Sequence, residues 1–152
     1  MAAAATARRI ARYAYLGLIL LFLAGVLVQA MLAGRFIFAG AEPTAHVELG
    51  WPLAHMLAPL AFLVSLFLGG GRAFWITSIV WFVSAAVQPI FAAMGTEGPN
   101  EAAALHIPNA LVLFVLSLWL ANRAWGMAMA KPVAAQPKPV ARAPTQPPPV
   151  RR

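Results

Sequence analysis

Four long apolar segments constrain the fold of this 152-residue chain more than any other feature. They cover residues of about 11–33, 45–68, 73–94 and 102–122. Each is near or above the ~20 residues that cross the hydrocarbon core of a bilayer as a helix. Helices are expected because backbone polar groups must be hydrogen-bonded within their own segment in lipid. Since the separators are short, the sequence predicts an all-α integral membrane domain, a four-helix up-down bundle.

The composition favours a bilayer over water as the solvent of this chain. It is 62% hydrophobic and 10% charged, whereas soluble domains are about 45–50% apolar and about 25% charged. The chain has no cysteine, which excludes disulfides, thiolate metal sites, iron–sulfur clusters and covalent c-type haem. It also has no Gly-x-Ser-x-Gly nucleophile motif. We therefore predict no catalytic residue and expect a non-enzymatic membrane protein.

The distribution of charge predicts how the helices are oriented. The chain carries a net charge of +7, and all its basic residues except Arg35 fall on one side of the four-span arrangement. That side holds Arg8, Arg9, Arg12, Arg72, Arg123, Lys131, Lys138, Arg142, Arg151 and Arg152. The other side holds Arg35 and the four acids, Glu42, Glu48, Glu97 and Glu101. The positive-inside rule then predicts both termini in the cytoplasm, with the protein in a bacterial inner membrane. The positive charge needs no nucleic-acid partner.

The two ends of the chain differ from its apolar middle. Residues 126–152 are rich in proline and base, so we predict a spanning domain over 1–125 and a disordered cytoplasmic tail after it. Such a tail could bind anionic lipid or a protein partner. At the other end, basic residues, an apolar run and "VQA" also match a cleaved signal peptide. The length of the apolar run favours a retained span.

A short repeat relates the two halves of the predicted bundle. Val-Gln occurs near the end of the first and third apolar segments, and a histidine follows each glutamine after a loop. Gln29 and His46 are 17 positions apart, and Gln88 and His106 are 18 apart. Two such hairpins would be related by an axis along the membrane normal, a parallel repeat. We therefore expect the two histidines at similar depth, in a polar layer with Asn109.

Two histidines on facing helices suggest a haem site. Neutral imidazoles can bind haem iron axially from opposite sides, so we predict that His46 and His106 are the ligands of a b-type haem between the second and fourth helices. Gly50, one turn after His46, would leave room for the macrocycle. His55 lies nine positions after His46, on the opposite face of the same helix. The two are therefore a poor pair, and His55 is the fallback partner of His106.

The remaining polar residues of the layer have two interpretations. Gln29, Gln88 and Asn109 could support a haem or a quinone. They could also only join helices, at roughly 0.5–2 kcal/mol each, and the histidines could likewise be structural. Zinc would need three or four converging ligands, a larger set than the sequence offers. Membrane electron transfer is thus one predicted function, and the alternative is an accessory or assembly subunit of a membrane complex.

The same motifs carry a resemblance. The stretches "VQAMLAG", "HVELG" and "ALHIPNA" resemble those of a family of small bacterial four-helix membrane proteins known only as a domain of unknown function. The similarity covers about residues 10–125 and departs where Ile107 precedes Pro108. It implies the four-helix fold and a membrane location. It implies no activity.

Overall fold

The computed structural model describes residues 2–95 and 101–130, and over these ranges the chain is all-helical. Its elements are α1 (Ala2–Ala39), α2 (Thr44–Pro52), a π-helical turn η1 (Leu53–Leu57), α3 (Ala58–Ser65), α4 (Gly71–Met94), a 3-10 turn η2 (Ala103–Leu105) and α5 (His106–Met129). Because α2, η1 and α3 follow one another without a break, the described residues form four long helices. All four are long and apolar enough to cross a membrane, which confirms the prediction at that level.

The helices extend beyond the apolar segments that predicted them. α1 begins at Ala2 rather than near residue 11, since the alanine-rich start of the chain has a high helix propensity. α5 continues to Met129, so it includes residues 126–129, which the sequence analysis assigned to the tail. Gly126 does not end this helix. Residues 131–152 of the predicted tail, together with Glu97, lie outside the described residues.

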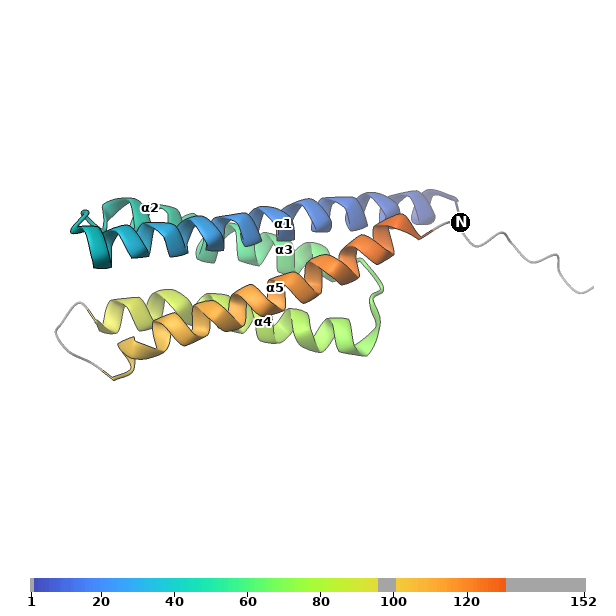
Figure 1. Ribbon diagram of the computed structural model, residues 1–152. Helices are drawn as coiled ribbons and strands as arrows, with labels where there is room; N and C mark the ends of the chain where they lie inside the picture. Colours follow the sequence, from blue (N-terminus) through green and yellow to red (C-terminus); the bar gives the residue numbers. More distant parts are fainter. Residues whose placement is uncertain (1, 96–100, 131–152) are drawn as a thin grey trace, which may run out of the picture.

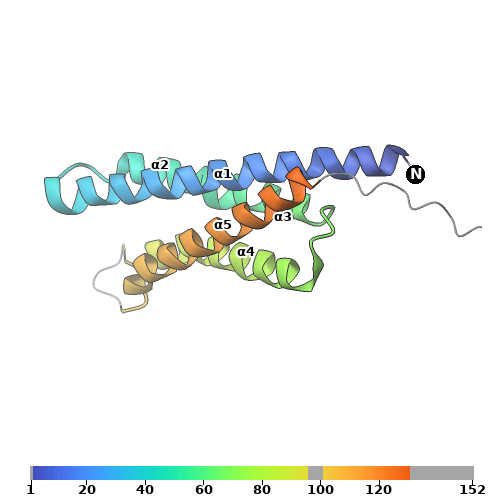
Figure 2. The same ribbon diagram turned by 45° about the vertical axis from the view of Figure 1, so that its right-hand side comes forward.

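The long helices form two hairpins (Figures 1 and 2). α1 runs beside α2 and α3, and α4 runs beside α5. The hairpins pack together because α5 lies along α1 and α3 lies along α4. One end of the molecule holds the start of α1 and the end of α5, and we call it the basic end. The opposite end holds the α1–α2 loop and the start of α5, and we call it the histidine end.

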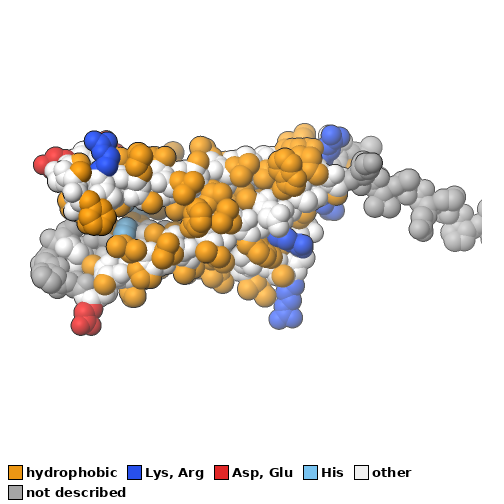
Figure 3. Space-filling model, viewed as in Figure 1, with side chains coloured by type: hydrophobic (Ala, Val, Ile, Leu, Met, Phe, Trp, Pro, Cys, Tyr) orange, Lys and Arg blue, Asp and Glu red, His pale blue; other side chains and the backbone are white. Residues whose placement is uncertain are grey.

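Large side chains fill the centre between the hairpins. Tyr15, Ile19 and Phe22 recur at helical spacing on α1 and are at most 2% exposed. The Phe22 ring meets the Trp81 ring edge-on at 4.8 Å between centroids. Outside, apolar side chains cover the flanks while charged ones gather at the two ends (Figure 3). This surface suits a protein surrounded by lipid.

One polar contact ties α4 to α5 within this core. Trp81 Nε1 donates to Ser117 Oγ at 2.9 Å, and Ser117 in turn donates to the Leu113 carbonyl of its own helix at 2.7 Å. Both side chains are fully buried. A buried indole N–H needs an acceptor, so Ser117 lets a tryptophan pack at the centre of an otherwise apolar core.

The π-helical turn lies between two prolines. Pro52 and Pro59 have no backbone N–H to complete an α-helical ladder, and the Ala58 N–H donates instead to the Leu53 carbonyl, five residues back. Leu53 packs onto α1 at a glycine: a Cβ on Gly25 would lie 2.5 Å from Leu53 Cδ2. The turn therefore sets both the facing of α2 and its close approach to α1.

Candidate functional site

In the first hairpin, the Gln29 side chain bonds to the His46 backbone, and the His46 side chain bonds to the Gln29 backbone. Gln29 Nε2 donates to the His46 carbonyl at 2.8 Å, and His46 Nδ1 lies 3.2 Å from the Gln29 carbonyl. α1 thus presents Gln29 in its last third, and α2 presents His46 in its first turn. The two reciprocal bonds fix the imidazole on the first hairpin.

Gln88 and His106 repeat this arrangement in the second hairpin. Gln88 Nε2 donates to the His106 carbonyl at 2.9 Å, and His106 Nδ1 lies 3.1 Å from the Gln88 carbonyl. The same four groups therefore make the same two bonds in both hairpins. The repeat read from the sequence corresponds to a repeated hydrogen-bonding unit.

These bonds decide which nitrogen of each imidazole carries the proton. A backbone carbonyl oxygen can only accept, so Nδ1 of His46 and of His106 must donate. In a neutral ring the proton then occupies Nδ1, and Nε2 keeps a free lone pair. Both histidines are thus held in the form that can bind a metal or a hydrogen-bond donor through Nε2.

The two rings come together across the hairpins. The centroids of His46 and His106 are 6.1 Å apart, and the ring planes are inclined at 63°. Two neutral imidazoles whose N–H groups are both bound elsewhere cannot hydrogen-bond to each other. A group bound by both Nε2 atoms would therefore have to be a cation, a metal or a hydrogen-bond donor. Within residues 2–95 and 101–130, no three His, Cys, Asp or Glu side chains come together as a larger metal site would need.

Asn109 completes the second hairpin's half of the site. Its amide donates to the Ser84 carbonyl at 2.9 Å and to Gln88 Oε1, and it accepts from Ser84 Oγ at 2.6 Å. Ser84 was not among the predicted residues. The sequence did hold a signal, because Ser84 precedes Gln88 by one helical turn and so lies on the same face of α4.

The first hairpin lacks this support. Leu49 and Gly25 occupy the positions that correspond to Asn109 and Ser84. Gln29 Oε1 is buried and has no hydrogen-bond partner among the residues that the structure describes. The two halves of the site are therefore alike in backbone and histidine geometry. Among the described residues, however, the glutamine side-chain oxygen has a hydrogen-bond partner only in the second hairpin.

Gly50 has a different neighbour from the one expected. A Cβ on Gly50 would lie 2.9 Å from Gln29 Nε2. The absent side chain therefore makes room for the Gln29 amide, which reaches the His46 carbonyl one turn away. In this conformation the space beside Gly50 is filled by the protein itself.

His55 lies apart from the pair. It is exposed, its Nδ1 is 3.0 Å from the Trp51 carbonyl, and its ring stacks on the Trp51 ring at 5.0 Å between centroids. The structure thus brings His46, rather than the fallback His55, to His106.

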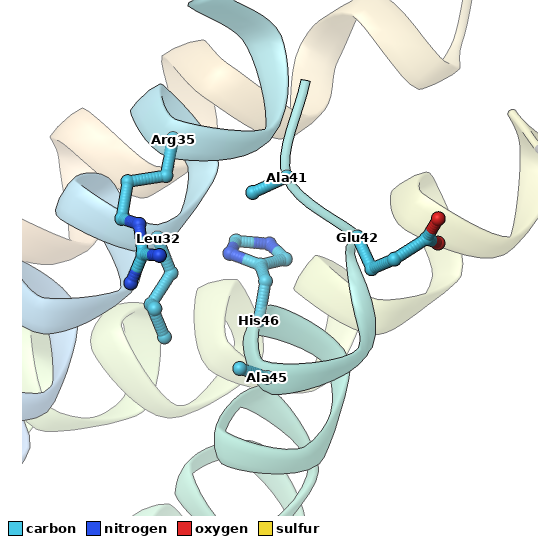
Figure 4. Close-up of a pocket in the computed structure, with 6 residues that line it drawn as sticks. All are labelled: Leu32, Arg35, Ala41, Glu42, Ala45 and His46. Carbon is cyan, nitrogen blue, oxygen red and sulfur yellow. The ribbon is translucent and has the colours of Figure 1, made fainter. Parts of the chain in front are cut away.

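A small cavity opens beside His46 at the histidine end. It has a volume of about 170 Å³ and is lined by Leu32, Arg35, Ala41, Glu42, Ala45 and His46. Figure 4 shows the imidazole between α1 and the α1–α2 loop, with the Glu42 carboxylate directed away from it. Ligand sites are commonly at least ~300 Å³, so this cavity is smaller than a common ligand site. Arg35 places a positive charge there.

The fold and the site together have the pattern of a multi-pass α-helical membrane protein with a duplicated glutamine–histidine unit. Comparison with protein-family models finds no match, and comparisons with curated proteins and with solved structures find none either.

Proposed function

We propose that this protein holds a b-type haem between α2 and α5 and transfers electrons within a bacterial inner membrane, with quinone as its reaction partner. His46 and His106 would be the axial ligands. The observation that supports this proposal is the facing pair of imidazoles whose Nδ1 atoms are both bound to backbone carbonyls.

The donor set fits an iron that two imidazoles would hold. The two ring centroids are 6.1 Å apart, close enough for both imidazoles to hold one iron. Histidines that bind metals commonly donate their second N–H to a carbonyl or carboxylate, which orients the ring and raises its basicity. Bound haem would supply one-electron chemistry. The chain supplies orientation through Gln29 and Gln88.

A macrocycle would have to enter between the two hairpins. Histidine atoms are visible in a hollow between the two hairpins at the histidine end (Figure 3). Gly50 offers no such room, since the Gln29 amide lies against it. Arg35, at the edge of this region, would meet the negative charge of haem carboxylates.

The charges support a cytoplasmic basic end. Among the described residues, that end collects Arg8, Arg9, Arg12, Arg72 and Arg123, while the histidine end carries Arg35, Glu42, Glu48 and Glu101. By the positive-inside rule both termini would be cytoplasmic, and the haem would lie toward the outer face. Reporter fusions at each terminus test this. A cytoplasmic signal from the C-terminus alone would favour the signal-peptide alternative.

The decisive experiment is a reduced-minus-oxidised absorption spectrum of the full chain purified after expression with added haem. We expect the bands of a low-spin b-type haem, their loss in His46→Ala and His106→Ala, and their retention in the matched control His55→Ala. Absence of bands in the unaltered protein would overturn the proposal. Co-purification with a larger complex that persists in His106→Ala would then favour the accessory-subunit alternative.

A further inference from the structure

A groove at the basic end has no part in the histidine site. It lies between the start of α1 and the last turns of α5 and has a volume of about 440 Å³, within the ~300–1,000 Å³ of common ligand sites. Its lining residues are Arg12, Asn122, Arg123, Gly126, Met127 and Ala130. Two guanidinium groups, an amide and a glycine thus surround one opening.

Arg12 crosses this groove and leaves one donor unused. Its Nη1 donates to the Met127 carbonyl at 3.1 Å, in the last turn of α5, where carbonyls have no intrahelical partner. Its Nε is buried and has no hydrogen-bond partner among the described residues. A buried donor on a charged group is costly to leave unpaired. The guanidinium group of this lining residue therefore keeps hydrogen-bonding capacity that the described residues do not use.

The charge of the groove is uncompensated by its lining. Arg123 lies with its guanidinium carbon 5.8 Å from the Trp119 ring centroid, a contact that orients the group without neutralising it. The described acids, Glu42, Glu48 and Glu101, belong to the histidine end. Paired guanidinium groups match the oxygen geometry of a phosphate. The lining is thus complementary to a phosphate-bearing anion.

We propose that this groove binds the phosphodiester headgroup of an anionic phospholipid. It lies at the ends of two helices of spanning length, where headgroups meet a membrane protein. Basic pockets between helices on the cytoplasmic side are typical sites for such lipids. The site is independent of the haem proposal.

Native mass spectrometry of the full chain, titrated in detergent with phosphatidylglycerol or phosphatidylcholine, tests this. We expect one tightly held phosphatidylglycerol per chain and weaker phosphatidylcholine binding. Arg123→Gln should weaken the phosphatidylglycerol affinity about fivefold, since each cationic side chain near an anionic surface contributes on that scale. Arg72→Gln is the matched control. It removes the same charge from the same end, but Arg72 is outside the lining.

A steric variant separates a defined site from general attraction. No atom lies within 4 Å of a Cβ placed on Gly126, so Gly126→Leu would occupy the groove, keep both arginines and favour the helix. We expect Gly126→Leu to abolish the tight binding of phosphatidylglycerol. Arg12→Gln should also weaken lipid binding, but it removes the bond to Met127 as well. Thermal unfolding is therefore measured for each variant. The test of the proposal rests on Arg123→Gln and Gly126→Leu, which keep that bond.

Three results would overturn the proposal. Equal losses in Arg72→Gln and Arg123→Gln would show diffuse electrostatic binding. Unchanged affinity in Gly126→Leu would place the lipid elsewhere. Displacement of the lipid by millimolar inorganic phosphate would assign the groove to a soluble anion.

Discussion

The imidazole ring of His46 lies 6.1 Å from that of His106, centroid to centroid, although the two residues belong to different hairpins. Each ring is oriented by a bond from its Nδ1 to the glutamine carbonyl of its own hairpin. The orientation of a ring therefore depends on one hairpin, whereas the separation of the rings depends on how the hairpins pack. Substitutions can test these two dependences separately.

Replacing the two glutamines with leucine should have unequal effects on stability. Gln88 donates to the His106 carbonyl and accepts from Asn109, whereas Gln29 donates to the His46 carbonyl and leaves its oxygen unpaired. At about 0.6 kcal/mol per interhelical hydrogen bond, Gln88→Leu should lower the free energy of unfolding by about twice as much as Gln29→Leu. Chemical unfolding in detergent measures both. Equal losses would show that the Asn109 bond contributes nothing.

Leu49→Asn should supply the donor that the first hairpin lacks. Leu49 corresponds to Asn109, and Gln29 Oε1 is the acceptor without a partner among the described residues. We expect Leu49→Asn to raise the free energy of unfolding by about 0.5 kcal/mol, and to do so only while Gln29 is present. The control is therefore the same substitution in a Gln29→Leu background. A gain that persists there would contradict the correspondence between the hairpins.

The correspondence of the hairpins shows how far the sequence could predict this site. The matched spacing of Gln29 with His46 and of Gln88 with His106 placed both histidines at one depth, and the structure brings them together. The reciprocal bonds to backbone were not predictable, because they depend on how closely each loop draws its two helices together. Ser84 was missed because its partner lies on another helix, and serines elsewhere in these spans bond to their own backbone.

Gly50→Ala should displace the Gln29 amide. A Cβ at Gly50 would lie 2.9 Å from Gln29 Nε2, so the amide would have to move and its bond to the His46 carbonyl would be strained or lost. We expect a loss of about 1 kcal/mol in the free energy of unfolding. Gly17→Ala is the control, because no atom lies within 4 Å of its Cβ position. It should gain about 0.5–1 kcal/mol from higher helix propensity. A similar gain in Gly50→Ala would contradict the close approach.

Ser117→Ala should destabilise the core more than Ser65→Ala. Ser117 Oγ accepts from the buried Trp81 Nε1, while Ser65 Oγ donates to the Phe62 carbonyl in its own helix. Removing Ser117 Oγ leaves the indole N–H without an acceptor, at a cost of about 1–3 kcal/mol. Ser65→Ala should cost much less, because it leaves no donor unpaired. Thermal unfolding gives the comparison, and equal shifts would show that the tryptophan finds another partner.

The number of helices was predictable and their detailed paths were not. Apolar length alone gave the four spans. Apolar length did not predict the continuation of α5 to Met129, where Arg12 of α1 bonds to the Met127 carbonyl. Pro52 and Pro59 signalled a disturbance in the second span, but proline positions do not distinguish a kink from a π-helical turn.

That turn has a consequence for the phase of the whole second span. A π-helical turn accommodates one residue more than an α-helical turn does, so the part of the span before η1 is rotated relative to the part after it. Deleting a single residue between Pro52 and Pro59 would rewind the segment and rotate α2 by about 100°. His46 would then point away from His106 while every residue of the polar layer remained in the chain. The approach of the two imidazoles therefore depends on the rotation of α2 about its axis, and the extra residue of the π-helical turn sets that rotation.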